Sequence, residues 1–184
     1  IGSARIIKML NVVDDQLVVE SKGIYSIENF LTSRRLMYWQ VYLHKTAVAC
    51  EKVLVNALKR AKQLVEQGES LFAPPALLYF LQNDVNADTF FKDPEALRNY
   101  EKLDDSDIWS SLKVWMESDD PILALLSRDM VDRNIFKVEV NTEPTSRERI
   151  DSLKSELSNH FGVNASDVNY LLNESTIEKD MYDF

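Results

Sequence analysis

The pattern of apolar and polar positions begins with two short runs and continues with longer helical segments. Ile6–Val12 and Leu17–Val19 are short, apolar and rich in β-branched residues. The Asp14-Asp15 pair between them is typical of a turn. We therefore expect a small β-hairpin near the start of the chain, ended by Gly23.

The stretch from Ser26 to Gln67 contains neither glycine nor proline, so either one long helix or two helices with a bend would fit. Ser26 suits an N-cap, and Gly68 is a natural stop. Apolar residues at spacings of three and four predict one buried stripe. The stripe consists of Ala47, Cys50, Leu54, Ala57, Ala61 and Leu64. The solvated side is expected to carry Lys59, Arg60 and Lys62.

The middle of the chain is expected to hold several antiparallel helices on short loops. Prolines or acidic residues stand at their starts, where a carboxylate opposes the helix dipole. A polar break, Asn83–Asp88, follows the first of them. The expected helices are Ala76–Gln82, one capped by Asp93-Pro94 and running through Tyr100, one capped by Asp104–Asp107 and running through Met116, and Ile122–Met130.

The C-terminal part predicts two strands around a helix. Asn134–Val140 alternates between apolar and polar residues, and Val168–Leu172 is a short apolar run, so both are interpreted as strands. Arg147–Phe161 is amphipathic and predicts a helix that Gly162 ends. This order, strand–helix–strand, suggests a small α/β appendage.

The predicted fold class is mainly α: a multi-helix domain with a short N-terminal β-hairpin and a small C-terminal α/β appendage. Residues 1–140 are assigned to the helical domain and residues 141–184 to the appendage, whose remaining strands would lie beyond Phe184. The chain starts with Ile1, not methionine, and its last residues resemble the middle of a domain. We therefore expect a piece of a longer protein, cut at both ends.

Composition narrows the classes of partner. The formal net charge of −9 argues against a general affinity for DNA, RNA or anionic membranes, because their phosphates are bound mainly by Lys and Arg. No apolar run approaches the roughly 20 residues of a membrane span, and no signal peptide is visible. The single cysteine, Cys50, allows no internal disulfide and is interpreted as a small core residue. The cytoplasm is the expected compartment.

The strongest candidate for chemistry is the segment Arg34–Glu51, which mixes basic and large aromatic residues within a few helical turns. Arg34, Tyr38 and Tyr42 are spaced i, i+4, i+8, so a helix would stack them on one face. A guanidinium beside two phenols could bind a phosphate and a base or sugar. The alternative is an aromatic core helix whose charged residues extend to solvent.

Other reaction centres are not evident. His44 and His160 lie far apart in the sequence and in no metal-binding spacing. The cluster Asp104–Asp107 lacks the glycine and the terminal glutamate of a calcium loop, so it is interpreted as helix capping. With four glycines in all, the chain shows no P-loop, no G-x-G-x-x-G and no G-x-S-x-G motif.

Several motifs in order resemble a known family, the deoxynucleotide triphosphohydrolases of the HD superfamily (dGTPase-like enzymes). The resemblance spans roughly residues 5–140. It rests on the hairpin followed by Asn29-Phe30, Arg34, Val41-Tyr42, His44-Lys45 and Glu51, on Arg133–Lys137, and on Asp104, Ile108, Trp109, Asp120-Pro121 and Leu126. Such a relation implies a largely helical fold, with residues 1–140 as the C-terminal part of an HD-type domain.

The resemblance also implies a metal-dependent hydrolysis that releases a deoxynucleoside and inorganic triphosphate. The family's metal set is His, then His-Asp, then a distant Asp, holding a divalent or transition metal such as Mg, Mn or Fe. In the family these ligands precede the hairpin, and none is in this chain. The expectation is therefore a C-terminal piece without the metal site, inactive alone, that supplies the downstream wall of the pocket.

Site roles follow position by position from the resemblance. Arg34 matches the arginine that contacts substrate phosphate, and Tyr42 the tyrosine on the deoxyribose. Tyr38, on the same face, departs from the more polar residue common there. His44 and Lys45 match positions near an effector nucleotide site in some regulated members. The expected partners are a deoxynucleotide and further copies of the chain; the alternative is a non-catalytic helical interaction module or nucleotide sensor.

Overall fold

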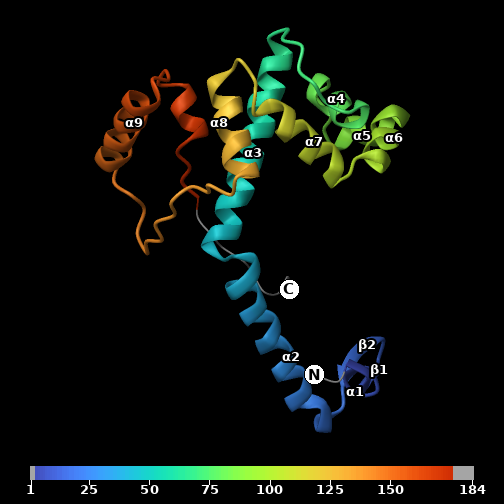
Figure 1. The fold of residues 1–184 in the computed structure, drawn as a ribbon. Helices are drawn as coiled ribbons and strands as arrows, with labels where there is room; N and C mark the ends of the chain where they lie inside the picture. The colour runs from blue at the N-terminus through green and yellow to red at the C-terminus, as the bar shows by residue number, and fades with distance from the viewer. Residues whose placement is uncertain (1–2, 176–184) are drawn as a thin grey trace. The chain divides into compact units, whose positions relative to one another are not determined.

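The computed structural model describes residues 3–175, which form two compact units, residues 3–47 and residues 48–175. Helices dominate, and an antiparallel hairpin lies near the N-terminus (Figure 1). The predicted mainly helical class with an N-terminal hairpin is therefore confirmed. No helix among residues 3–175 is long and apolar enough to cross a lipid bilayer.

The first unit begins with a short helix and the predicted hairpin. Its elements are α1 (Ser3–Ile7), β1 (Leu10–Val13) and β2 (Gln16–Val19). The turn between the strands holds Asp14 and Asp15, with φ angles of 51° and 59°. Positive φ at both central residues matches the twist of a tight hairpin, and aspartate tolerates this conformation better than most residues. The first strand starts later than predicted, because Ile6 belongs to α1.

Helix α2 (Ile24–Met37) starts before the predicted cap, because Gly23 and not Ser26 is its N-cap. Gly23 is buried, and a Cβ there would lie 2.9 Å from the sulfur of Met9 and 3.0 Å from a methyl of Val19. A side chain at this position would therefore force the hairpin away from the helix start. The absence of a side chain makes the close approach possible.

Of the two alternatives for the long helical stretch, the structure shows two α-helices with an irregular joint. A π-helical segment, Tyr38–Tyr42, follows α2, and α3 (Lys45–Glu66) follows the segment. Gly68 ends this stretch as predicted, in a left-handed conformation with φ 94°.

Helix α3 carries the core of the second unit along a stripe that differs from the prediction in its first half. Ala57, Ala61 and Leu64 are buried as predicted, whereas Ala47 is exposed and Cys50 and Leu54 are half-buried. In their place the structure buries Ala49 and Val53. Leu54, three residues before Ala57, and Val53, four residues before it, are both apolar, so the sequence pattern alone does not decide which of them is buried. Packing in the structure buries Val53.

The predicted middle helices are present, and one more lies among them. Three of their starts are capped by a carboxylate that accepts backbone N–H bonds, from Asp93, Asp104 and Asp120. Part of the predicted polar break is instead helical, because Asn86 and Thr89 form a reciprocal capping box. The helices are α4 (Pro75–Gln82), α5 (Ala87–Lys92), α6 (Pro94–Lys102), α7 (Asp105–Trp115) and α8 (Pro121–Val131).

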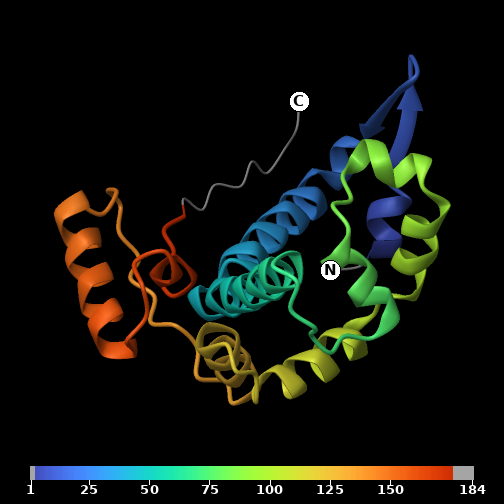
Figure 2. The same cartoon turned by 90° about the horizontal axis from the view of Figure 1, so that it is seen from above.

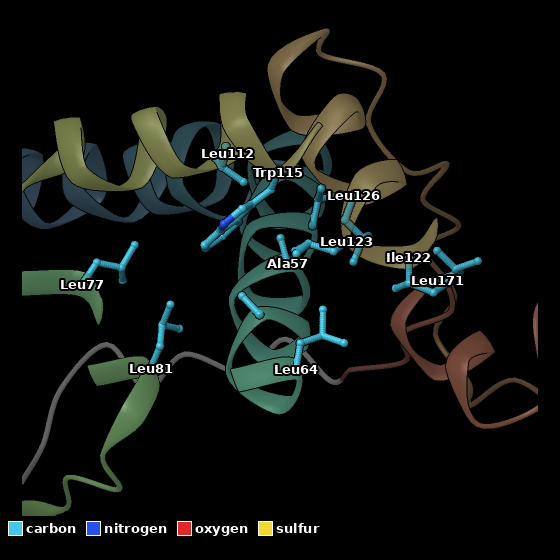
Figure 3. Packing of buried hydrophobic residues seen from close by; sticks show 12 residues of the cluster. Ala57, Leu64, Leu77, Leu81, Leu112, Trp115, Ile122, Leu123, Leu126 and Leu171 are labelled. Carbon is cyan, nitrogen blue, oxygen red and sulfur yellow. The ribbon is translucent and has the colours of Figure 1, made fainter. Parts of the chain in front are cut away.

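The core of the second unit forms where α7 and α8 pack on α3 (Figure 3). Trp115 is almost fully buried, and its indole N–H donates to the carbonyl of Phe72 at 2.8 Å. The small side chains of Ala57 and Ala61, both fully buried, allow the neighbouring helices to approach α3 closely. Other members of the cluster are Val53, Leu64, Leu77, Leu81, Leu112, Ile122, Leu123, Leu126 and Leu171.

The C-terminal helix is confirmed, but the two strands predicted around it are wrong. Helix α9 spans Arg147–Phe161 and ends at Gly162 with φ 65°. Residues 134–140 form no strand, and Asp167–Tyr170 is a 3₁₀ helix. A strand needs a partner edge, and the sheet in residues 3–175 consists of β1 and β2 alone. The boundary predicted at residue 140 stays a prediction.

Apolar residues assigned to the second strand pack into the helical core instead. Val168 and Leu171 are buried. Asn56, on α3, donates from its side-chain amide to the carbonyl of Tyr170 at 2.8 Å. Seen from above, the last described residues lie beside the helices of this unit, with α9 outside them (Figure 2). Burial against α3 satisfies the apolar pattern without a sheet.

Candidate functional site

The predicted phosphate-binding residues lie where α2 passes into the π-helical segment Tyr38–Tyr42. The backbone N–H of Leu43 donates to the carbonyl of Tyr38 at 2.7 Å, a span of five residues. One extra residue per turn widens the helix and displaces the following side chains. Turns of this kind are frequent at functional sites, and the sequence pattern did not predict one here.

The three predicted side chains stack in the order of their spacing. The guanidinium carbon of Arg34 lies 5.6 Å from the ring centroid of Tyr38. The rings of Tyr38 and Tyr42 are 5.4 Å apart and tilted by 47°. The predicted common face is therefore confirmed. The exchange of one α-helical turn for a π-helical one leaves this stack in place.

The ends of this stack are open to solvent. Arg34 is exposed, Tyr38 is half-buried, and Tyr42 is 57% exposed. Within residues 3–175 no carboxylate forms an ion pair with Arg34. A guanidinium that no described carboxylate neutralises can bind an anion, and the tyrosine face beside it can pack on a flat or apolar group.

His44 and Lys45, the predicted effector residues, lie at the start of α3. The Nδ1 atom of His44 accepts a hydrogen bond from the backbone N–H of Thr46 at 3.3 Å. This contact satisfies one of the free donors at the helix start, which is a structural task. Both side chains are exposed, and among residues 3–175 neither bonds to Arg34 or Tyr42. The described contacts do not bring the two predicted sites together.

The described residues offer no metal site. Within residues 3–175 there is no group of three or more His, Cys, Asp or Glu side chains placed to hold a metal ion. Asp104 and Asp107, considered as a calcium loop above, instead bond to backbone N–H groups at the start of α7. The metal that the resemblance implies therefore does not fit the residues described here.

A buried ionic cluster was missed by the sequence analysis. Arg60, predicted on the solvated side of α3, has a side chain only 11% exposed. It donates to both carboxylate oxygens of Asp120, at 3.1 and 2.6 Å, and to Asp167 at 3.0 Å. Gln63 and Tyr170 complete the cluster, the first accepting from Arg60 at 2.8 Å and from the Tyr170 hydroxyl at 2.8 Å.

The cluster shifts the pKa values of Arg60 and Asp120. Hydrogen bonding to Asp120 raises the pKa of Arg60, despite burial, which acts the other way. Burial by itself raises the pKa of Asp120, but the bonds from Arg60 and from the Leu123 N–H outweigh it, so this pKa lies below its usual value. The cluster thus fixes the start of α8 and the 3₁₀ helix to α3. It has no free acid or base for catalysis.

Comparison with known proteins gives three findings. A family model described as the HD associated region matches residues 1–72. The protein YwfO of Bacillus subtilis (strain 168), named as uncharacterized, is 31% identical over 181 residues, which are 98% of this chain and 39% of that protein. The crystal structure of a phosphohydrolase from Bacteroides thetaiotaomicron VPI-5482 superposes with a TM-score of 0.94 at 57% identity, covering 100% of this chain and 45% of that chain.

The findings support a relation to an HD-type phosphohydrolase family. The matched region includes the hairpin, α2, the π-helical segment and the whole of α3, and thus all five predicted site residues. The chain spans about two-fifths of the length of the curated relative it matches. A high TM-score at this level of identity means that the helical arrangement described above is shared with the phosphohydrolase.

Proposed function

We propose that this chain supplies substrate-binding residues to an HD-type phosphohydrolase that cleaves deoxynucleoside triphosphates into deoxynucleoside and triphosphate. The main support is the open stack of Arg34, Tyr38 and Tyr42 at a π-helical turn. These residues lie within residues 1–72, which match the family model of the HD associated region. The phosphohydrolase structure shares this fold at 57% identity, which supports the reaction class.

Each residue of the stack has a chemical task in this proposal. Arg34 donates two parallel N–H bonds to phosphate oxygens, the geometry that a planar guanidinium favours. Tyr42 packs its ring against the deoxyribose and leaves no room for a 2′-hydroxyl. Tyr38 lies between them and holds the guanidinium over its ring, which restricts the arginine before substrate arrives. His44 and Lys45 are proposed to contact an effector nucleotide.

The hydrolytic step is assigned to residues outside this chain. Within residues 3–175 no group of three or more His, Cys, Asp or Glu side chains is placed to hold a metal. In this proposal the described side chains bind and orient the substrate, and the water is activated elsewhere. The chain alone is therefore proposed to be inactive. The exposed apolar residues of α2 and the π-helical segment, among them Leu36, Trp39 and Val41, favour assembly with further copies.

The same exposed residues support a second candidate, a non-catalytic helical module that binds a protein partner or senses a nucleotide. The two candidates differ in what Arg34 does. In the first, removal of its charge weakens phosphate binding; in the second, it leaves any hydrolysis by the longer protein unchanged.

The test compares Arg34→Ala with Arg35→Ala in the longer polypeptide that carries this sequence. Both arginines are exposed and neighbours on α2, but only the first is stacked on Tyr38. We expect Arg34→Ala to lower kcat/KM for deoxynucleoside triphosphates by the equivalent of roughly 1.5–3 kcal/mol, the scale of a charged hydrogen bond. Arg35→Ala should stay near the parent value.

Triphosphate release is measured for the four deoxynucleotides, with this chain alone as the control for activity. Unchanged KM and kcat in Arg34→Ala would contradict the site assignment. An absence of triphosphate release by the longer polypeptide, with any divalent metal, would favour the non-catalytic candidate. Hydrolysis by the isolated chain would contradict the proposal that the hydrolytic step depends on residues outside this chain.

A further inference from the structure

A second surface feature lies far from Arg34 in the sequence, where α4, α5 and α6 of the second unit meet. An open apolar groove of about 610 Å³ is formed there. Helices α4–α6 lie together in both views (Figures 1 and 2). Its walls are Phe80, Val85, Asn86, Ala87, Phe90, Phe91, Tyr100 and Leu103.

Aromatic side chains form the groove, and some of them are exposed to an unusual degree. Phe91 is 87% exposed and Tyr100 is 61% exposed. Phe90, half-buried between them, meets both rings edge-on, with centroids 6.0 Å from Phe91 and 5.5 Å from Tyr100. Large apolar side chains held on a surface in this way mark an interaction site more often than a single exposed residue does.

The framework of the groove is fixed by local hydrogen bonds. The hydroxyl of Tyr79 on α4 donates to the carboxylate of Asp93, which also accepts from the Glu95 N–H at the start of α6. This bond raises the pKa of Tyr79 to about 12 and lowers that of Asp93. These bonds thus hold α4 to the start of α6 beside the groove.

One polar atom in the lining of the groove, the side-chain oxygen of Asn86, is already bonded. The side-chain oxygen of Asn86 accepts from the backbone N–H groups of Asp88 and Thr89 as the cap of α5. A small polar ligand would therefore find little to orient it, because recognition of such ligands depends on a few well-placed polar groups. An apolar side chain is the better match for these walls.

The charge around the groove indicates the remaining chemistry of its occupant. Residues 84–107 carry eight acidic and three basic side chains, so five of the chain's nine net negative charges lie in this stretch. Asp88 follows Ala87 directly and Glu101 follows Tyr100; both are exposed, and neither forms an ion pair within residues 3–175. An excess of acidic side chains in the segment that forms the groove repels nucleic acid and anionic lipid and attracts cationic groups.

We propose that this groove, defined by Phe90, Phe91 and Tyr100, binds a cationic segment of a partner protein that presents large apolar side chains flanked by Lys or Arg. The apolar side chains enter between α5 and α6, and the basic residues face the acidic side chains of the same segment. This is the general mode in which an amphipathic peptide segment occupies an apolar groove.

The probe for the test is a fluorescein-labelled peptide of Leu and Lys in an amphipathic pattern, paired with the same peptide carrying Glu in place of Lys. Fluorescence anisotropy measures their binding to the chain at low and high salt. We expect the Lys peptide to bind, more weakly as salt rises, and the Glu peptide not to bind. Equal binding of the two peptides, or binding of neither, would overturn the proposal.

Two matched variants locate the binding. Phe91→Ala is expected to weaken binding of the Lys peptide by about tenfold, the effect of losing an apolar anchor. Phe91→Leu, which keeps apolar bulk, should lose less. Phe161→Ala removes an exposed phenylalanine from α9 and should leave the affinity within about twofold, since single surface changes away from an interface have small effects.

Light scattering on the same variants separates a partner protein from a second copy of the chain. If Phe91→Ala converts an oligomer to a monomer while the Lys peptide does not bind, the groove is a self-association surface and the proposal is overturned. Equal losses of affinity in Phe91→Ala and Phe161→Ala would also overturn it. Because Phe91 is so exposed, its replacement leaves the fold intact, which circular dichroism checks.

Discussion

Residues 3–47 and residues 48–175 bury their side chains to very different extents. In the first unit Met9 and Gly23 are the buried residues among those described, and α2, of 14 residues, buries none. The second unit has a continuous core around Trp115. A helix of about this length without packing is marginal in water. The described residues of the first unit therefore have little core of their own, whereas the second unit is stabilised by its core.

The largest expected contrast between the units comes from one substitution made in each. Trp115→Ala removes a buried ring and leaves the carbonyl of Phe72 without its indole donor, so we expect a loss of about 3–5 kcal/mol in the free energy of unfolding. Trp39→Ala, at a side chain 56% exposed, should cost no more than about 0.5 kcal/mol. Urea unfolding followed by far-UV circular dichroism measures both. Equal costs would contradict the contrast.

Ion pairs provide the next comparison. Asp120→Asn keeps the shape of the side chain but removes the charge that faces Arg60, and we expect a loss of about 2 kcal/mol. Glu20→Gln removes the acidic partner of Lys22 in the first unit, where both side chains are well exposed, and should change stability by less than about 0.5 kcal/mol. The same urea titrations apply. A larger cost for the exposed pair would show that burial does not decide the strength of these contacts.

Acid should weaken the second unit through the same carboxylate. The pKa of Asp120 is lowered from its ordinary value near 3.8, so the unfolded chain takes up this proton first as the pH falls. Its contribution is therefore complete above about pH 5 and is lost as the pH falls through the unfolded-state pKa towards the lower folded-state pKa. Stability measured between pH 7 and pH 3 should fall less steeply in Asp120→Asn than in the parent.

The pKa of Asp129, in the same unit, is shifted in the opposite direction. This shift is present in both the parent and Asp120→Asn, so it cancels when their stability curves are compared. Burial raises the pKa of Asp129, so its contribution favours the folded state at low pH. Parallel curves for the parent and Asp120→Asn would contradict the assignment of the acid sensitivity to Asp120.

The elements that could be predicted from the sequence are those fixed by neighbours in the chain. Asp93, Asp104 and Asp120 cap helices whose own backbone N–H groups they bond, so the helix starts were predictable. The stack of Arg34 and its two tyrosines follows from spacing and was predicted for the same reason. The roles of these three side chains in binding stay predictions.

What could not be predicted depends on residues far apart in the sequence. Arg60 is buried because its partners, 60 and 107 residues further on, fold against it, and nothing in the neighbouring Lys and Arg residues indicates this. The segment 168–172 has an apolar pattern that suits a strand or a buried turn equally. The presence of α3, and the lack of a strand edge beside the segment in residues 3–175, decides the outcome.

The smallest expected contrast concerns single hydroxyl groups in the second unit. Ser127, on α8, is fully buried, and its hydroxyl has no hydrogen-bond partner within residues 3–175. Ser111, on α7, is equally buried but donates to the carbonyl of Asp107 at 2.8 Å. Ser155, on α9, is exposed and donates to the carbonyl of Asp151 at 2.9 Å. All three lie in helices, so replacement by alanine gives each a similar gain in helix propensity.

We expect Ser127→Ala to raise the free energy of unfolding by about 1 kcal/mol more than Ser155→Ala does, because it removes a buried polar group that forms no bond. Ser111→Ala loses its bond at a buried position, where water cannot replace it as it can at the exposed Ser155, and should rank below both. Thermal and urea unfolding of the three variants measure the order. If Ser127→Ala were instead the most destabilising of the three, the Ser127 hydroxyl would form a hydrogen bond in solution. The prediction that it is an unbonded buried group would then be wrong.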